Sequence, residues 1–165
     1  MSAPPVRRGA SDGAQWDAVE EAAELLHEQR FHAALVELRR VLQEDGQNAY
    51  AFYLLGIALF ESGELEAARD AYRACIQLAP SHLGARVALS HVLRALGDTR
   101  AALREGMAAL AQADGDGDAL HAVGLAYLAR GEHAAARKYL EAFLETSPEF
   151  EVETEVRSIL GTLGD

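Results

Sequence analysis

Small and chain-breaking residues recur in this chain at intervals of 34 positions, and this spacing constrains the fold more than any other feature. Four sets of residues keep the register: Ala34, Ala68, Ala102 and Ala136; Gly63, Gly97 and Gly131; Gly56 and Gly124; Pro80 and Pro148. No insertion or deletion interrupts the spacing. A fixed period of this length is typical of stacked structural repeats, each too small to bury its apolar face alone.

Within each copy, the residue types predict two helices joined by a tight turn. Gly63 ends the first helix, because glycine adopts the left-handed conformation beyond a helix end without strain. Gln29 occupies the same slot in the first copy. A proline such as Pro80 cannot continue the second helix. We expect small residues such as Gly56 and Ala68 to face each other, which lets the two helices pack closely.

The period also predicts the organisation of the chain. The four copies span 15–48, 49–82, 83–116 and 117–150. Residues 1–14 hold almost no large apolar side chain and are predicted to form a disordered tail. Residues 151–165 are predicted to form a final helix that covers the end of the fourth copy. The apolar positions of that helix are Val152, Val156, Ile159, Leu160 and Leu163. Asn48 and Ser147 are predicted N-caps.

The second and fourth copies carry the residues of a known signature. In the second they are Phe52, Leu55, Gly56, Leu59, Ala68, Tyr72 and Pro80, and in the fourth Leu120, Val123, Gly124, Tyr127, Ala136, Leu140 and Pro148. This pattern resembles the tetratricopeptide repeat, W-x2-L-G-x2-Y followed by A-x3-F and P. The resemblance implies an all-α fold, a right-handed α-solenoid of four helix pairs with the final helix as a cap.

The third copy departs most from the signature. Arg86 stands where an aromatic side chain belongs, and Gly106 stands where a phenylalanine belongs. Both changes are expected to remove core volume, and Gly106 weakens its helix by up to ~1 kcal/mol relative to alanine. The third repeat is therefore predicted to be the least stable. In the first copy Glu21 replaces a leucine, which suits an end repeat with one solvated face.

The balance of charge constrains the partner. Fifteen Lys and Arg residues face 26 Asp and Glu residues, for a formal net charge of −11. Such a field repels nucleic-acid phosphates and anionic lipid head groups, so we expect an apolar or basic protein segment as partner. With neither a membrane-spanning run nor a signal peptide evident, a cytoplasmic location is predicted. Arginine and alanine richness favours a GC-rich bacterial source.

No constellation of catalytic or metal-binding residues emerges from the sequence. The acidic run from Asp114 to Asp118 lacks the glycine of a calcium loop, because Ala119 follows its third acid. Cys75, the single cysteine, is expected to be a buried thiol. His91 and His121 are expected on neighbouring helices, but a metal would need further ligands. The chain is predicted to be no enzyme, with neither cofactor nor metal.

The expected binding site lies on the first helices of the repeats. In stacked helix pairs these helices line a concave groove, into which their second, fifth, ninth and twelfth positions point. We call these positions the groove stripe. The stripe residues predicted to bind a partner are Tyr50, Tyr53, Ile57, Phe60, Val87, His91, Arg94, His121, Leu125 and Leu128. Because other positions of the first helix of the second repeat already serve the core, its apolar stripe is spare and indicates a binding surface.

Three functional interpretations remain open at this point. The first is a non-enzymatic adaptor or scaffold that binds an apolar peptide or amphipathic helix in the groove. The second, by analogy of size, acidity and repeats, is a chaperone similar to those of type III secretion translocators. The third is a structural subunit that associates with itself, or a groove filled by the chain's own tail or last helix. A clamp for acidic C-termini is not expected, because apolar residues such as Val19, Ala23 and Ile57 occupy its slots.

Overall fold

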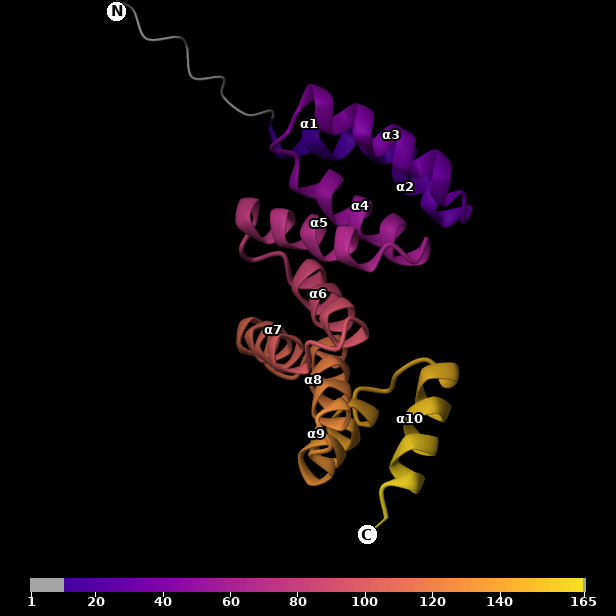
Figure 1. Ribbon diagram of the computed structural model, residues 1–165, viewed down its shortest axis with the longest axis vertical. Coiled ribbons are helices and arrows are strands. Elements are labelled where there is room, and N and C mark those ends of the chain that lie inside the picture. The colour runs from indigo at the N-terminus through magenta and orange to yellow at the C-terminus, as the bar shows by residue number, and fades with distance from the viewer. Residues whose placement is uncertain (1–10, 165) are drawn as a thin grey trace, which may run out of the picture. The chain divides into compact units, whose positions relative to one another are not determined.

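The computed structural model describes residues 11–164, and this part of the chain forms ten helices and no strand (Figure 1). The helices are α1 (Asp12–Asp17), α2 (Glu20–His27), α3 (Phe31–Glu44), α4 (Ala49–Glu61), α5 (Leu65–Leu78), α6 (Leu83–Ala95), α7 (Thr99–Gln112), α8 (Gly117–Ala129), α9 (His133–Leu144) and α10 (Phe150–Thr162). They form two compact units, α1–α5 and α6–α10. In both, successive helices of a repeat pack against each other.

The turns between paired helices follow the repeat. Gly63, Gly97 and Gly131 have φ values of 78°, 84° and 74°, and Gln29 has a φ of 58° in the corresponding slot. The backbone geometry therefore stays the same when the glycine is absent. Gln29 adopts it at a cost of about 1–2 kcal/mol, which the packing around the turn must offset.

The glycines of the first helices face large side chains of the second helices. A Cβ atom on Gly56 would lie 2.4 Å from Cε1 of Tyr72, and one on Gly124 would lie 2.6 Å from Cδ2 of Leu140. Tyr72 is 3 % exposed and Leu140 is fully buried. The side chain that each glycine faces thus belongs to the residue four positions after the alanine that was expected to face it. In the second repeat that alanine is Ala68, which is itself buried. The glycine makes room for a ring or a leucine rather than for another small residue.

The third repeat fills the corresponding space differently. A Cβ atom on Gly106 would lie 3.0 Å from Cγ2 of Val123 in the following repeat and 3.3 Å from Oγ of Ser90. The Ser90 hydroxyl donates a hydrogen bond of 2.7 Å to the carbonyl of Ala102. A side chain of the next repeat therefore lies against Gly106, where the signature has a phenylalanine.

Arg86 also has a structural role. Its Nη1 donates to Oε2 of Glu105 over 2.9 Å, and the two side chains are only 17 % and 28 % exposed. Glu105 lies on α7, so the pair joins the two helices of the third repeat. An ion pair therefore holds α6 to α7 in the slot where an aromatic ring was expected.

The ends of the chain differ from the expectation in detail. The first helix of the first repeat is divided into α1 and α2 around Ala18 and Val19. α1 begins at Asp12, inside the range 1–14 predicted as tail, while residues 1–10 lie outside the described part. Asn48 caps α4 as predicted, accepting from the Ala51 N–H over 3.1 Å. Ser147 is not a cap, because it has a φ of 57° and α10 begins at Phe150.

The final helix packs on the fourth repeat through the expected apolar side. Val156 is fully buried beside Leu140 and Phe143, and three further residues of α10 pack around this cluster: Val152, Ile159 and Leu160. Arg137 on α9 donates hydrogen bonds to the carbonyls of Leu160 and Gly164, which fixes the carboxyl end of α10. α10 begins 33 residues after the start of α8, so its position nearly matches that of the first helix of a further repeat.

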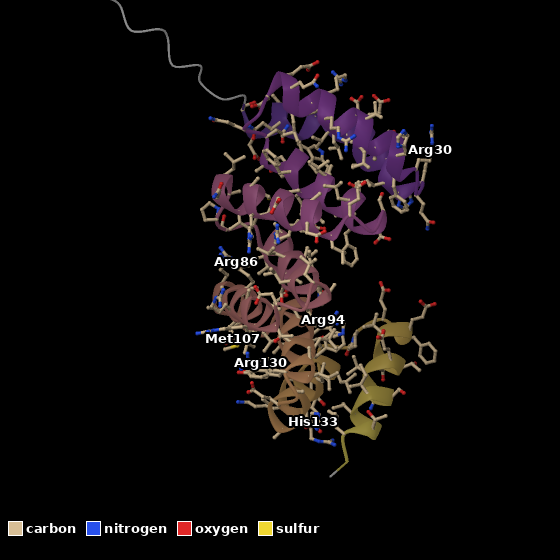
Figure 2. The ribbon with its side chains drawn as sticks, viewed as in Figure 1. Arg30, Arg86, Arg94, Met107, Arg130 and His133 are labelled. Atoms are coloured by element: carbon tan, nitrogen blue, oxygen red, sulfur yellow. The ribbon has the colours of Figure 1, made fainter. Side chains whose placement is uncertain are left out.

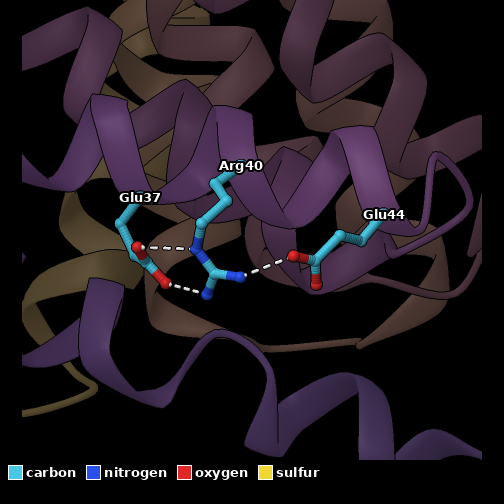
Figure 3. A network of polar contacts seen from close by, with 3 residues as sticks. All are labelled: Glu37, Arg40 and Glu44. Carbon is cyan, nitrogen blue, oxygen red and sulfur yellow. Dashed lines mark hydrogen bonds and ion pairs between the residues drawn. The ribbon is translucent and has the colours of Figure 1, made fainter.

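The solvated side of α3 carries a charged network. Nε and Nη2 of Arg40 donate to the carboxylate of Glu37, and Nη1 donates to Oε1 of Glu44 over 2.7 Å (Figure 3). The bonds from Arg40 lower the pKa of Glu37. These pairs follow the three- and four-residue spacing of a helix surface, and exposed pairs contribute little to stability. This face of α3 is ordinary surface.

Candidate functional site

In the unit α1–α5, the groove stripe of α4 is partly covered. Tyr50 donates a hydrogen bond of 2.8 Å to Oδ1 of Asp12, and its ring lies edge-on to Trp16 at 5.5 Å between centroids. The hydrogen bond to Asp12 raises the pKa of Tyr50. Tyr50 therefore serves to hold α1 against α4. Trp16 occupies the same stripe position of the first copy as Tyr50 does of the second, whereas Asp12 was not among the predicted site residues.

The rest of that stripe remains at the surface. Tyr53 and Ile57 are half-buried, and Phe60 is 37 % exposed. The ring of Tyr53 lies 6.1 Å from that of Tyr72, which is the ring that fills the space above Gly56. A bound segment on Tyr53 would thus rest on a side chain fixed by the core.

In the unit α6–α10, the stripe combines core and surface residues. Val87 is only 8 % exposed and packs with Ala109, Ala119 and Ala122, so its side chain serves the core rather than a partner. Leu125 and Leu128 on α8 are half-buried. Leu125 also contacts the apolar cluster beneath α10. Of the predicted apolar residues here, those on α8 remain accessible.

His91, Arg94 and His121 form one polar cluster. The imidazole rings of His91 and His121 lie 5.8 Å apart, and His121 stacks on Phe143 at 4.7 Å. Arg94 lies in the last turn of α6 (Figure 2), where a cation suits the helix dipole. Its Nε is buried and has no hydrogen-bond partner in the described part of the chain.

Burial keeps the two imidazoles neutral at physiological pH. Burial lowers the pKa of His91 to about 4, with further lowering by Arg94 and His121. The pKa of His121 is also lowered, chiefly by burial, although Glu155 of α10 and Asp118 act in the opposite direction. Neutral imidazoles offer one donor and one acceptor each. The cluster can therefore orient a polar group of a bound segment, with Arg94 as the charged donor.

Two observations bear on metal binding and on the single cysteine. No group of three or more His, Cys, Asp or Glu side chains within residues 11–164 could hold a metal ion. Cys75 is fully buried, and burial raises the pKa of its thiol to about 11. A thiol of that pKa is almost wholly protonated at neutral pH and is a poor nucleophile.

Comparison with protein families identifies the repeats. Two family models, both described as tetratricopeptide repeat, match residues 25–74 and 87–149. The chain belongs to the tetratricopeptide repeat family. This match confirms the resemblance read from Gly56, Ala68 and their equivalents. A comparison with curated protein sequences found no match.

Solved structures of this family superpose on the chain. MamA from Desulfovibrio magneticus has a TM-score of 0.79 at 21 % identity, covering 93 % of this chain and 85 % of that one. TTC0263, a tetratricopeptide repeat protein of Thermus thermophilus, has a TM-score of 0.72 at 24 % identity, covering 90 % and 80 %. The first repeat domain of Spaghetti (RPAP3), solved with the HSP90 peptide SRMEEVD, has a TM-score of 0.64 at 24 % identity, covering 73 % and 97 %. These likenesses confirm the predicted fold class, the α-solenoid of tetratricopeptide repeats.

None of the helices within residues 11–164 is long and apolar enough to cross a membrane.

Proposed function

We propose that this protein is a non-enzymatic adaptor that binds an apolar helical or extended segment of another protein on the groove stripe of its first helices. The observation that carries the proposal is α4. Leu54, Ala58 and Leu59 bury one side of this helix, while Tyr53, Ile57 and Phe60 add apolar surface on another. A surface helix that needed only to stack would carry polar residues there.

The contrast in burial supports this choice of residues. Phe60 keeps 37 % of its surface in water, although leucines one and six residues earlier are almost fully buried. Aromatic side chains bring large contact area at low conformational cost, which is why they dominate the energetically important parts of protein interfaces. Tyr53 and Phe60 would therefore contribute most of the binding free energy on this helix.

The unit α6–α10 offers polar groups of its own to a bound segment. An unpaired buried donor costs about 1–3 kcal/mol, and Nε of Arg94 is such a donor. In this unit the rest of the Arg94 guanidinium would bind polar groups of a segment, while Leu125 and Leu128 contact apolar side chains of that segment. The net charge of −11 favours a segment whose remaining charges are basic.

The family relation is consistent with this role. The RPAP3 domain was solved with a peptide bound, which shows a related helical scaffold holding a short segment of another protein. The same relation favours an adaptor over an enzyme for this chain.

The test compares stripe variants with a matched surface variant. The partner protein is first isolated by affinity purification on the wild-type chain. We expect Tyr53→Glu/Ile57→Glu to weaken the binding of this captured partner by at least about 100-fold, as measured by titration calorimetry. Val36→Glu on α3 is the control, because Val36 is 57 % exposed and lies off the stripe. Circular dichroism establishes that each variant is folded, and Phe60→Glu repeats the test at a more exposed position.

Unchanged affinity in the folded stripe variants would overturn the proposal. Arg94→Gln is expected to weaken binding about tenfold, because it removes the charged donor but keeps an amide of similar reach. If the captured partner is an unfolded membrane-active client, the chaperone interpretation gains; if it is a second copy of this chain bound through Tyr53, the self-association interpretation gains.

A further inference from the structure

A basic hollow lies on α7, away from the groove stripe. It has a volume of about 770 Å³ and is lined by Arg100, Leu103, Arg104, Met107 and Arg130. Met107 is 39 % exposed at its floor, and no acidic residue lines it. Met107 and Arg130 lie together on this flank (Figure 2). Three guanidinium groups around an apolar floor are unexpected in a chain of net charge −11.

The local electrostatics make the two arginines of α7 costly. α7 begins at Thr99, so Arg100 lies in the first turn, where the helix dipole disfavours a cation. Arg104 follows four residues later, and like charges at that spacing repel each other. Within the described residues neither side chain forms an ion pair. Of the three arginines that line the hollow, only Arg130 pairs with an acid, Glu132, at 2.6 Å. A bound anion would offset both costs.

The same unit presents a feature of complementary chemistry. Phe150 at the start of α10 is 80 % exposed, more than any other large hydrophobic residue among those described. Glu149 and Glu151 flank it, and both are exposed. Acidic residues suit the beginning of a helix, so the carboxylates are stable there without an ion-pair partner. We call Glu149, Phe150 and Glu151 the acidic knob.

The knob cannot reach the hollow of its own chain. α7 packs against α6 and α8, whereas α10 packs on α9. Figure 1 shows α7 and α10 on opposite sides of α8. Any contact between knob and hollow therefore joins two molecules.

We propose that the acidic knob of one copy docks into the basic hollow of a second copy, with Phe150 on Leu103 and Met107 and the two glutamates against Arg100 and Arg104. In the proposed head-to-tail arrangement each copy places its knob in one neighbour and receives the knob of another in its hollow. Such a contact propagates into a ring or a filament. It is independent of the groove stripe, which stays open to the partner proposed above.

Sedimentation velocity and light scattering at about 0.15 M salt test this contact. At that ionic strength the Debye length of about 8 Å screens the repulsion between acidic copies, but the close pairs remain. We expect the wild type to grow beyond a dimer as its concentration rises. Arg100→Glu/Arg104→Glu and Phe150→Ser should each raise the dissociation constant at least tenfold, by roughly the amount a lost interface anchor or reversed charge costs.

Mixing the two variants gives the sharpest readout. The Arg100→Glu/Arg104→Glu chain keeps its knob, and the Phe150→Ser chain keeps its hollow. Together they can form one intact contact and no second one, so we expect a 1:1 dimer that grows no further. An interface made of the same patch on both copies could not give this result.

Matched controls come from α3, where Arg39 and Val36 are exposed. Arg39→Glu and Val36→Ser should associate like the wild type. A wild type that stays monomeric at high micromolar concentration would overturn the proposal, and so would hollow or knob variants that still associate fully. Loss of association in Tyr53→Glu/Ile57→Glu alone would assign self-association to the groove stripe instead.

Discussion

The second and third repeats use the same slots with opposite residue choices. Gly56 and Tyr72 in the second repeat correspond to Ser90 and Gly106 in the third. In the second repeat, the slot on the first helix holds a small residue, and the ring of Tyr72 from the second helix fills the space beside it. In the third repeat, the slots on both helices hold small residues, and the side chain of Val123 from the next repeat lies against Gly106. The second repeat thus closes its core with its own side chain, whereas the third depends on its neighbour.

The surfaces of these repeats differ in a parallel way. Ile57 and Phe60 in the second repeat correspond to His91 and Arg94 in the third. An apolar stripe suits burial of a partner's side chains, while the imidazole and guanidinium offer hydrogen-bonding groups. The comparison teaches that one backbone scaffold supports two kinds of contact, because Ile57, Phe60, His91 and Arg94 occupy other positions than the glycine slots that set the pairing of the two helices.

The largest effect should come from filling the glycine of the second repeat. Gly56→Ala places a methyl group 2.4 Å from the buried ring of Tyr72, and we expect a loss of about 3 kcal/mol in the free energy of unfolding. Urea denaturation measures it. Gly161→Ala in α10 is the control, because nothing lies within 4 Å of a Cβ there and alanine favours a helix. Equal stability of the two variants would mean that the second repeat is not closed by Tyr72.

A second prediction uses the pH dependence of stability to distinguish the stripe of the third repeat, which contains His91, from that of the second, which has Ile57 in the same slot. Because burial lowers the pKa of His91 from 6.5 to about 4, the unfolded chain takes up a proton in this range before the folded chain does. Stability is therefore present above pH 6.5 and is lost as the pH falls toward 4, by about 2 kcal/mol for this residue. Arg94 and His121 act on His91, and Glu155 and Asp118 act on the neighbouring His121.

His91→Ile, which copies the second repeat, isolates that contribution. Carboxylates titrate alike in both proteins, so the difference in unfolding free energy between neutral and acid pH reports on His91. We expect the variant to lose less stability in acid than the wild type. Parallel pH curves for the two proteins would show that His91 takes up its proton equally in the folded and the unfolded chain. Its pKa would then not be lowered by folding.

The smallest effect concerns the dependence of the third repeat on the fourth. Gly106→Ala puts a methyl group 3.0 Å from Cγ2 of Val123, and we expect a loss of about 1 kcal/mol. In a Val123→Ala background the same change should become neutral or stabilising, because the opposing methyl groups are gone. A double-mutant cycle measures this coupling. Additive effects would show that Val123 does not support the third repeat, and hydrogen exchange along α6 and α7 would test whether that repeat is the least stable.

Much of the fold was predictable because the repeat fixes positions along the chain. The period placed the helices and their turns, including the left-handed turn at Gln29, where no glycine signals it. It also placed His91, Arg94 and His121 on one face, and the structure brings the three together. Periodicity states which residues share a helix face, and that is sufficient for predictions of this kind.

Contacts between helices were not predictable in the same way. The sequence indicated small residues facing small residues, but Tyr72 fills the space at Gly56. It assigned Val87 to the binding surface, but the side chain is buried against α7 and α8. It did not indicate that Asp12 would accept a hydrogen bond from Tyr50. Each outcome depends on side-chain length and on the approach of a neighbouring helix.

The sequence by itself determined the helix pairs, their register and the family, because small and chain-breaking residues act locally on the backbone. Only the tertiary structure decided which side chains remained for binding. Burial is a property of neighbours that are distant in the chain, so the 80 % exposure of Phe150 and the arginine-lined hollow around Met107 emerged once the helices were packed.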